Sequence, residues 1–284
     1  MTSALRLRAE GVGWITGWQI SRKLPERMVV RAFERMSARS YRTNARRREI
    51  VRANLEPVVG AERLDDVVRD AFRWYGRYWA ETFRIPDLSD AEFDRRLSVE
   101  GDEHIQAAHD GGRGGLLATL HQGNWDAGGR WVAKRWGVTA VAEVLRPRAL
   151  FERFVEHREA LGIKIIPLEK GSEATARCRE ELERGRLVAL VSDRDMSGRG
   201  IEVTMFGRRT TLPRGPASLA LQTGAPLIPA TILQHDDGTW RAIVLPPLVV
   251  DDIERTTQRL GDSLARLIEM APAQWHMFSR YWIG

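Results

Sequence analysis

The sequence contains almost no cysteine and no long apolar run. Cys178 is the only cysteine among 284 residues, so no disulfide can form within the chain and no cysteine cluster can bind a metal. We therefore expect a protein of the reducing cytoplasm, with Cys178 packed as a small side chain in a helix. No stretch approaches the roughly 18 consecutive apolar residues of a membrane-spanning helix, and no charged-then-apolar signal opens the sequence. We expect neither a spanning helix nor a signal peptide.

Two common catalytic motifs are also missing. No Gly-x-Ser-x-Gly occurs, which disfavours a hydrolase with a nucleophile elbow. The glycine-rich stretch 111–115 precedes an apolar strand and lacks a Gly-Lys-Ser/Thr ending, so it predicts a turn rather than a phosphate loop. His104 and His109 stand among acidic residues, but a charged surface helix explains that pattern. We expect neither a metal site nor a cofactor.

Short apolar segments alternate with helical ones from Gly111 onward. This pattern predicts an α/β fold, with a mixed, largely parallel central sheet covered by helices on both faces. Residues 1–110 form a mainly helical region and residues 111–284 an α/β catalytic core, within a single domain spanning 1–284. The expected strands are 115–120, 138–144, 164–168, 187–192, 201–206, 227–233 and 241–248. The expected helices are 29–53, 64–83, a short one opened by the capping pattern Ser89-Asp90-Ala91-Glu92, 126–136, 147–161, 173–184, 214–223 and 253–270.

Positive charge is concentrated in the first 54 residues. They carry thirteen Lys and Arg against four Glu, a net charge of +9, whereas the whole chain is +6. Six arginines spaced by three or four residues occupy one 120° sector of the predicted helix 29–53 and the turn before it: Arg27, Arg31, Arg35, Arg39, Arg42 and Arg46. Such a face is either solvated or rests on anionic phospholipid, where each charge contributes roughly 1 kcal/mol. Trp14 and Trp18 suit a membrane interface. No nucleic-acid-binding motif accompanies the arginines, so we expect no nucleic-acid partner.

His121 is the strongest catalytic candidate. It follows the apolar run 116–120 directly, and Asp126 comes five residues later. Transfer of a group to a hydroxyl needs a base, and imidazole is matched to neutral pH. A carboxylate on the other ring nitrogen would hold the right tautomer. If a turn joins a strand to a helix here, it brings Asp126 back toward His121, so we expect Asp126 to be the orienting partner.

The residues around His121 form a longer motif. The stretch from His121 to Asp126, His-Gln-Gly-Asn-Trp-Asp, with Gly128-Gly129 and Trp131 behind it, resembles the core motif of the lysophospholipid acyltransferase superfamily. It looks closest to the branch that contains the lipid A lauroyl/myristoyl acyltransferases and the actinobacterial phosphatidylinositol mannoside acyltransferases. Further stretches match in the expected order, at 142–147, 192–195 with 200–207, and 213–217 with 223–225. The ending 272–277, Pro-Ala-Gln-Trp-His-Met, resembles the mannoside branch.

This resemblance implies an acyltransferase that needs no cofactor. It would move a long-chain, palmitoyl-like group from acyl-CoA to a mannose hydroxyl of a mannosylated phosphatidylinositol. His121 would be the general base and the attack direct, without an acyl-enzyme. The protein would be peripheral, on the anionic cytoplasmic face of the cell membrane. Two alternatives stay open: a lipid A-type or lysophospholipid acyltransferase, and a catalytically inert lipid-binding protein. Chain length, donor carrier and oligomeric state are open as well.

Other polar candidates stand at strand ends or helix starts. Asp193 directly follows the predicted strand 187–192, so it can lie beside His121 at the same end of the sheet. The mannoside branch has a glutamate at the position of Asp193. Because aspartate is one carbon shorter, Asp193 would act through a water molecule, or Asp195 would take its place. Arg158 matches an arginine that the branch uses near its active centre, although an ion pair with Glu143 would explain it as well. Glu143 itself ends the strand 138–144.

The remaining candidates concern the ligands' anionic and apolar parts. Arg214 opens a helix whose free N–H groups suit an anionic headgroup or the coenzyme phosphates, although a plain helix start explains it equally well. Apolar residues near the motif could line an acyl groove, namely Trp125, Trp131, Trp136, Met205 and Phe206. Each of the five also suits the core. Trp125 is the best groove candidate because it lies between His121 and Asp126.

Overall fold

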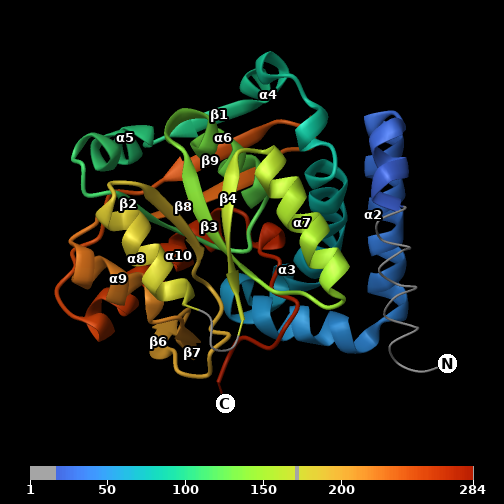
Figure 1. Ribbon diagram of the computed structural model, residues 1–284. Coiled ribbons are helices and arrows are strands. Elements are labelled where there is room, and N and C mark those ends of the chain that lie inside the picture. Colours follow the sequence, from blue (N-terminus) through green and yellow to red (C-terminus); the bar gives the residue numbers. More distant parts are fainter. Residues whose placement is uncertain (1–16, 170–172, 284) are drawn as a thin grey trace.

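A seven-stranded sheet forms the centre of the protein. The structure is a computed structural model that describes residues 17–169 and 173–283 (Figure 1). Trp14 therefore lies outside the described residues. The strands follow the order β1-β9-β8-β2-β5-β3-β4, and only the pair β8–β9 is antiparallel. Their bounds are β1 Leu97–Glu100, β2 Gly115–Thr119, β3 Val138–Glu143, β4 Ile163–Leu168, β5 Leu187–Val191, β8 Leu227–Gln234 and β9 Trp240–Val244. The prediction of a mixed, largely parallel sheet is confirmed.

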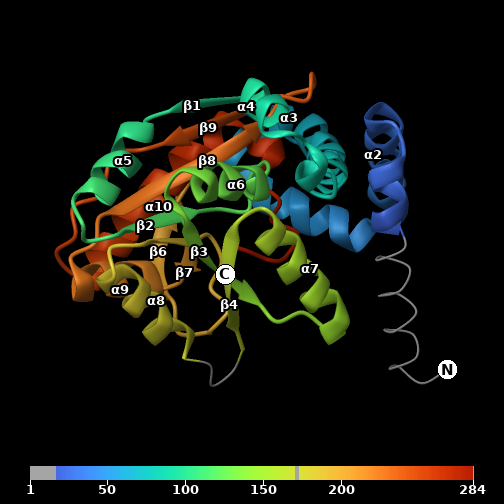
Figure 2. The same ribbon diagram turned by 45° about the horizontal axis from the view of Figure 1, so that its top comes forward.

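Helices cover both faces of this sheet (Figures 1 and 2). Side chains of β2 alternate between the two faces: Leu116 packs in one apolar cluster and Leu117 in the other. Helices α5 (Asp102–Asp110) and α6 (Trp125–Trp136) close the cluster of Leu117. Helices α8 (Ala174–Glu183), α9 (Gly215–Thr223) and α10 (Ile253–Met270) close the cluster of Leu116. Burial on both faces explains why the central strands read as continuous apolar runs.

Helices α2 and α3 of the N-terminal region lie beside the sheet (Figure 2). Helix α2 (Glu26–Thr43) ends where Asn44 caps α3 (Ala45–Thr82), its side chain accepting a hydrogen bond from the Arg47 backbone N–H at 3.0 Å. The prediction of one helix over 29–53 is therefore wrong, because a side-chain cap starts a new helix inside it. Helix α3 then runs on to Thr82 and bends at Gly60, whose φ is 70°.

The structure differs from the prediction at three other places. The hairpin of β6 (Ile201–Met205) and β7 (Arg208–Leu212) forms a separate two-stranded sheet packed on α10. Strand β1 was not predicted. Strand β9 ends at Val244, before the predicted end at 248. The remaining elements are η1 Ile85–Asp87, α4 Asp90–Arg96, α7 Arg148–Ala160 and η2 Pro272–Gln274. Helix α4 begins as expected, with the Ser89 side chain accepting from the Glu92 N–H at 3.2 Å.

The six predicted arginines all lie at the surface, but on two helices. Five of them belong to the outer side of α2 and Arg46 belongs to α3, and all six are exposed. Trp18 is a correction: it is only 1% exposed and stacks on Phe83 with a centroid separation of 4.4 Å, so it cannot contact a membrane. Among the described residues, no helix combines the length and apolarity needed to cross a bilayer.

Candidate active site

His121 pairs with Asp193 at one end of the sheet. His121 follows β2 and Asp193 follows β5, and these strands are parallel neighbours. Their carboxyl ends therefore place the two side chains together. The His121 Nδ1 lies 2.7 Å from the Asp193 Oδ1, and the His121 backbone N–H donates to Oδ2 at 2.9 Å. The carboxylate is fully buried, whereas the imidazole is 32% exposed. This arrangement leaves the other ring nitrogen, Nε2, for a ligand.

A third donor reaches Asp193 from the end of the chain. The Trp275 indole N–H donates to the Asp193 Oδ2 at 3.0 Å. Burial by itself raises the pKa of Asp193, but the charge of His121 and the hydrogen bonds from His121 and Trp275 outweigh it, so the pKa lies below its ordinary value. Asp193 is therefore an anion, fixed in one orientation by three hydrogen bonds.

The residues after His121 fix the shape of the turn. The Gln122 amide donates to the carbonyls of Leu267 and Ala271 at the end of α10 and accepts from Thr231. Gly123 has φ 60°, and a Cβ there would lie 1.7 Å from the Ile232 carbonyl oxygen, so glycine is required.

Asn124 then starts α6. Its Oδ1 accepts from the Ala127 N–H at 3.2 Å, and its Nδ2 donates to the buried Glu81 at 3.3 Å. Residues 122–124 of the motif thus hold His121 in place through their contacts with α10, β8 and α3.

Asp126 is not the partner of His121, which corrects the prediction. It lies in the first turn of α6 and faces α3 and α7, where it accepts from the Tyr78 hydroxyl at 3.0 Å and the Arg158 Nε at 2.9 Å. No hydrogen bond between described residues joins it to His121. Burial alone would raise the pKa of Asp126. The charge of Arg158 and these hydrogen bonds outweigh burial, so the pKa lies below its ordinary value and the carboxyl is ionised. The sequence spacing was misleading because the neighbouring strand supplies a closer carboxylate.

The other polar candidates have different partners than expected. Arg158 pairs with Asp126 and not with Glu143, which instead lies 3.8 Å from Arg194 at the surface. Asp195 closes its own loop by accepting from the backbone N–H groups of Ser197 and Gly200. It therefore does not replace Asp193 beside His121. Arg214, directly before α9, is exposed and lines the space in front of His121.

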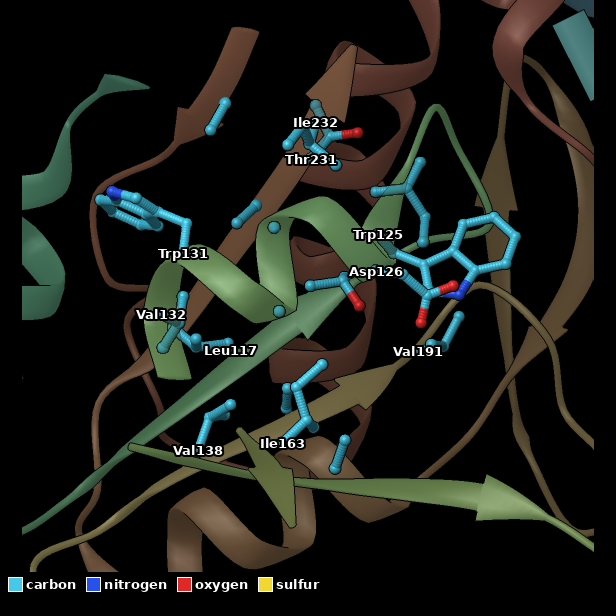
Figure 3. Close-up of a pocket in the computed structure, with 18 of the residues that line it drawn as sticks. Leu117, Trp125, Asp126, Trp131, Val132, Val138, Ile163, Val191, Thr231 and Ile232 are labelled. Carbon is cyan, nitrogen blue, oxygen red and sulfur yellow. The ribbon is translucent and has the colours of Figure 1, made fainter. Parts of the chain in front are cut away.

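Two adjoining spaces meet at this site. The outer cleft, about 820 Å³, contains His121 and the arginines Arg194, Arg199 and Arg214 on its wall. The inner cavity, about 110 Å³, runs between α6 and the sheet and is lined mostly by apolar side chains (Figure 3). Trp125, Val141, Arg158 and Val191 line both spaces, so these residues mark the junction. Neither Arg194 nor Arg199 was predicted, because charged loop residues carry no local signal of their role.

Three of the predicted groove residues lie elsewhere. Trp125 and Trp131 line the inner cavity, as expected for groove residues. Met205 is buried in the core against α10, and Phe206 packs against Trp282. Trp136 packs on the edge of Trp131. The hairpin explains the positions of Met205 and Phe206, because β6 lies outside the main sheet and carries them away from α6.

His276 is a buried neighbour of His121 that the prediction missed. Its backbone N–H donates to the His121 carbonyl at 2.6 Å, and its ring lies against Tyr75 and Tyr78. Burial lowers the pKa of His276 to about 3, so the imidazole is neutral at physiological pH. Among the described residues, no group of three or more His, Cys, Asp or Glu side chains could hold a metal ion.

The fold and the site together define an α/β protein in which a histidine backed by a buried carboxylate lies at the junction of a polar cleft and an apolar cavity. The chain belongs to the family described as bacterial lipid A biosynthesis acyltransferase, which matches residues 4–283. It is an acyltransferase. It is 38% identical, over 280 residues, to the phosphatidylinositol mannoside acyltransferase of Mycolicibacterium smegmatis, covering 96% of this chain and 91% of the relative. The protein of that name in Mycobacterium tuberculosis H37Rv is 37% identical over 291 residues, covering 99% and 91%.

Proposed function

We propose that this enzyme transfers a long-chain, palmitoyl-like group from acyl-CoA to a mannose hydroxyl of phosphatidylinositol mannosides. The mannosylated acceptor is supported by the names of the mycobacterial relatives, which align over 91% of their own length. The observation that carries the chemistry is the His121–Asp193 pair, placed where the outer cleft meets the inner cavity. A hydroxyl in the cleft and an acyl carbonyl at the junction would meet beside the imidazole.

The reaction is a direct general-base transfer. The His121 Nε2 accepts the proton of the mannose hydroxyl as its oxygen attacks the thioester carbonyl carbon. The carbon–sulfur bond then breaks, and the departing thiolate takes the proton from the imidazolium. Asp193 holds the Nδ1–H tautomer and balances the positive charge that develops on the ring. General-base catalysis of this kind contributes roughly 10²–10⁴-fold to the rate.

Arg158 would bind the acyl carbonyl or a nearby phosphate oxygen. It lines both spaces, and Asp126 fixes its guanidinium through Nε. A guanidinium held in this way keeps N–H groups free to donate to an anionic oxygen. In this role Asp126 acts through Arg158, and the acyl chain extends from the junction into the inner cavity.

The cationic wall of the outer cleft suits the phosphates of coenzyme A. Arg194, Arg199 and Arg214 contribute guanidinium groups there, and Arg214 directly precedes the N-terminus of α9. Guanidinium groups bind phosphate oxygens in a bidentate manner. This charge supports a coenzyme donor, with the thioester carried inward toward His121.

The exposed side of α2 would bring the enzyme to the cytoplasmic face of the membrane as a peripheral protein. Its five arginines would contact anionic headgroups. Met28 lies among them and is 58% exposed, and Leu24 and Ile20 are exposed just before the helix. Apolar side chains between basic ones allow shallow insertion beside the charged headgroups.

Acyl transfer with a panel of acceptors tests this function. We expect labelled palmitoyl-CoA to give a labelled product with phosphatidylinositol mannosides, and little product with a lipid A precursor or a lysophospholipid. His121→Ala should lower the rate at least about 10²-fold, while circular dichroism stays unchanged. His109→Ala, at an exposed position on α5, is the matched control.

Three outcomes would overturn the proposal. A product with the lipid A precursor alone would favour the alternative acceptor, which the description of the family supports. No product with any acceptor, or full activity in a folded His121→Ala enzyme, would contradict the catalytic assignment. The absence of product with every acceptor would leave an inert lipid-binding protein as the better explanation.

A further inference from the structure

Helix α3 contains a buried asparagine in its first half. Asn54 is 2% exposed, and its neighbours Val51 and Leu55 belong to the apolar core. Asparagine is a weaker helix former than alanine or leucine, and burial of its amide costs free energy unless the amide is hydrogen-bonded. An asparagine at this position therefore needs a local explanation.

The Asn54 amide binds three backbone groups of one segment. Its Nδ2 donates to the carbonyls of Met277 at 2.9 Å and Ser279 at 2.7 Å, and its Oδ1 accepts from the Tyr281 N–H at 3.2 Å. All three residues belong to the segment 276–282, which is part of no helix or strand. Such a segment has no regular pattern of backbone pairing, so the side chain of Asn54 supplies the partners that these groups need.

This segment is in contact with the catalytic pair at two places. It follows Trp275, whose indole donates to Asp193, and the Tyr281 ring packs edge-on against the Trp275 ring with the centroids 4.7 Å apart. At its first residue, the His276 N–H donates to the His121 carbonyl at 2.6 Å. Two short chains of contacts thus lead from the asparagine to the pair, one through Tyr281 and Trp275 and one through His276.

We propose that Asn54 is a positioning residue for the transfer reaction. It fixes the segment 276–282 on α3, and the segment holds the Trp275 indole against Asp193. The inference rests on the proposed function, in which Asp193 holds the tautomer of His121. Without the amide, three backbone groups lose a partner, and the segment opens toward water because an unpaired buried polar group is costly. The indole N–H then leaves Asp193 for part of the time.

The test compares the pH dependence of kcat/KM in wild type, Asn54→Ala and Asn54→Leu. Leucine keeps most of the volume, so it removes the hydrogen bonds without leaving a large cavity. A weakened bond from Trp275 leaves more of the negative charge of Asp193 to stabilise the protonated imidazole. We expect the acid limb to move to higher pH in both variants, by up to about 1 pH unit, the shift for complete loss of that hydrogen bond.

The ionisable groups packed around the catalytic pair keep their charge state over the range of this measurement, pH 5 to pH 9. Burial lowers the pKa of His276 to about 3 and raises the pKa of Tyr281 well above its ordinary value, so both stay neutral. For Asp126 and Asp195, burial raises the pKa, but charge and hydrogen bonds outweigh it, so both pKa values are lowered and both groups stay anionic. A moved acid limb therefore reports on the pair itself.

Asn44→Ala is the matched control. It makes the same substitution on the same helix and lowers stability, because the Asn44 side chain caps α3 by accepting from the Arg47 N–H. No hydrogen bond between described residues joins this side chain to the segment 276–282. Its melting temperature should fall, whereas its acid limb should equal that of the wild type.

A double variant tests the path through the indole. In a Trp275→Phe background the hydrogen bond to Asp193 is already absent, so Asn54→Leu should move the acid limb no further. A second shift as large as in the wild-type background would mean that Asn54 does not act through Trp275, which contradicts the inference.

Exchange of the Trp275 indole proton with solvent separates this inference from the proposed function. NMR follows it without donor or acceptor, and we expect it to be roughly tenfold faster in both Asn54 variants and unchanged in Asn44→Ala. Unchanged acid limbs in folded Asn54→Ala and Asn54→Leu, whatever the exchange rates, would overturn the inference while leaving the transfer reaction intact. If no acceptor gives a product but exchange is faster in the Asn54 variants alone, the placement of Trp275 by Asn54 stands and the proposed reaction fails.

Discussion

The ionised state of Asp193 depends on the hydrogen bonds that its carboxylate accepts. A buried carboxylate stays ionised only when charge and donors compensate for the lost water. Here His121 provides two hydrogen bonds and Trp275 provides one. Trp275 is only 1% exposed and packs on Tyr281, so its indole cannot turn away. It is a positioning residue that acts through Asp193.

Replacing Trp275 by phenylalanine should change the pH dependence of transfer. Without the indole N–H, more of the negative charge of Asp193 acts on the imidazolium, which stabilises the protonated and inactive base. The acid limb of the kcat/KM profile should therefore move to higher pH, by up to about 1 pH unit for a hydrogen bond of about 1 kcal/mol. The measurement is a set of initial rates from pH 5 to pH 9, together with a melting curve.

Trp282→Phe provides the control for this experiment. Its indole N–H also donates to a neighbour, the Asn54 carbonyl at 3.2 Å, within the same aromatic cluster, but it does not contact Asp193. Equal acid limbs in the two variants would mean that Trp275 contributes packing alone.

At the scale of single residues, the sequence located His121 and Asp193 because both follow apolar strands. Parallel strands bring their carboxyl ends to one edge, so this part of the site was predictable. The role of Asp126 was not predictable. The spacing between His121 and Asp126 gives their separation along the chain, but not the side of α6 that carries Asp126. Tyr78 and Trp275 reach the site from α3 and the chain end, and no local pattern indicates such contacts.

At the scale of elements, apolar runs predicted the central strands well, whereas helix boundaries depended on single capping and bending residues. Asn44 divides the N-terminal helix, and Gly60 bends the next one. The pattern of β6 identified a strand, but not that its antiparallel partner β7 would take it out of the main sheet. Pairing is a tertiary property, since a half-buried strand looks alike in a hairpin and in a sheet.

The outer side of α2 gives a prediction at this scale. Charge reversal of Arg31, Arg35 and Arg42 should reduce binding to anionic vesicles by several kcal/mol, at roughly 1 kcal/mol for each basic residue. Wild-type binding should weaken with salt, as the Debye length falls from about 10 Å at 0.1 M to about 3 Å at 1 M. Co-sedimentation with anionic and neutral vesicles at two salt concentrations measures both effects.

The control reverses three exposed arginines elsewhere: Arg63 on α3, Arg208 on β7 and Arg266 on α10. It changes the net charge equally, so a smaller loss of binding assigns the effect to α2. Equal losses would mean that net charge alone attracts the vesicles. Undiminished vesicle binding by the α2 variant would mean that this surface is merely solvated.

At the scale of the whole molecule, buried histidines set the response of stability to acid. His157 is 5% exposed and lies against the Trp18 ring; burial lowers its pKa from 6.5 to about 4. The unfolded chain therefore takes up a proton near pH 6.5, whereas the folded chain holds His157 neutral until about pH 4. Unfolding is favoured as the pH falls through this window. By contrast, the pKa values of Asp126 and Asp193 are lowered, so stability that depends on them is lost only at more acidic pH.

His157→Phe should remove part of this sensitivity while keeping a ring of similar shape against Trp18. Between pH 7 and pH 5 the wild type should lose about 2 kcal/mol through His157, because 1.5 pH units lie inside the window at 1.36 kcal/mol each. His276, whose pKa is lowered to about 3, should contribute a similar loss that the variant retains.

Denaturant titrations at pH 7, 6 and 5 measure the free energy of unfolding, with exposed His109→Ala as the control. If the free energy of unfolding depends on pH in the same way in wild type and His157→Phe, His157 does not contribute to the acid sensitivity. The folded protein would then protonate His157 by opening the contact between α7 and Trp18, with no loss of stability.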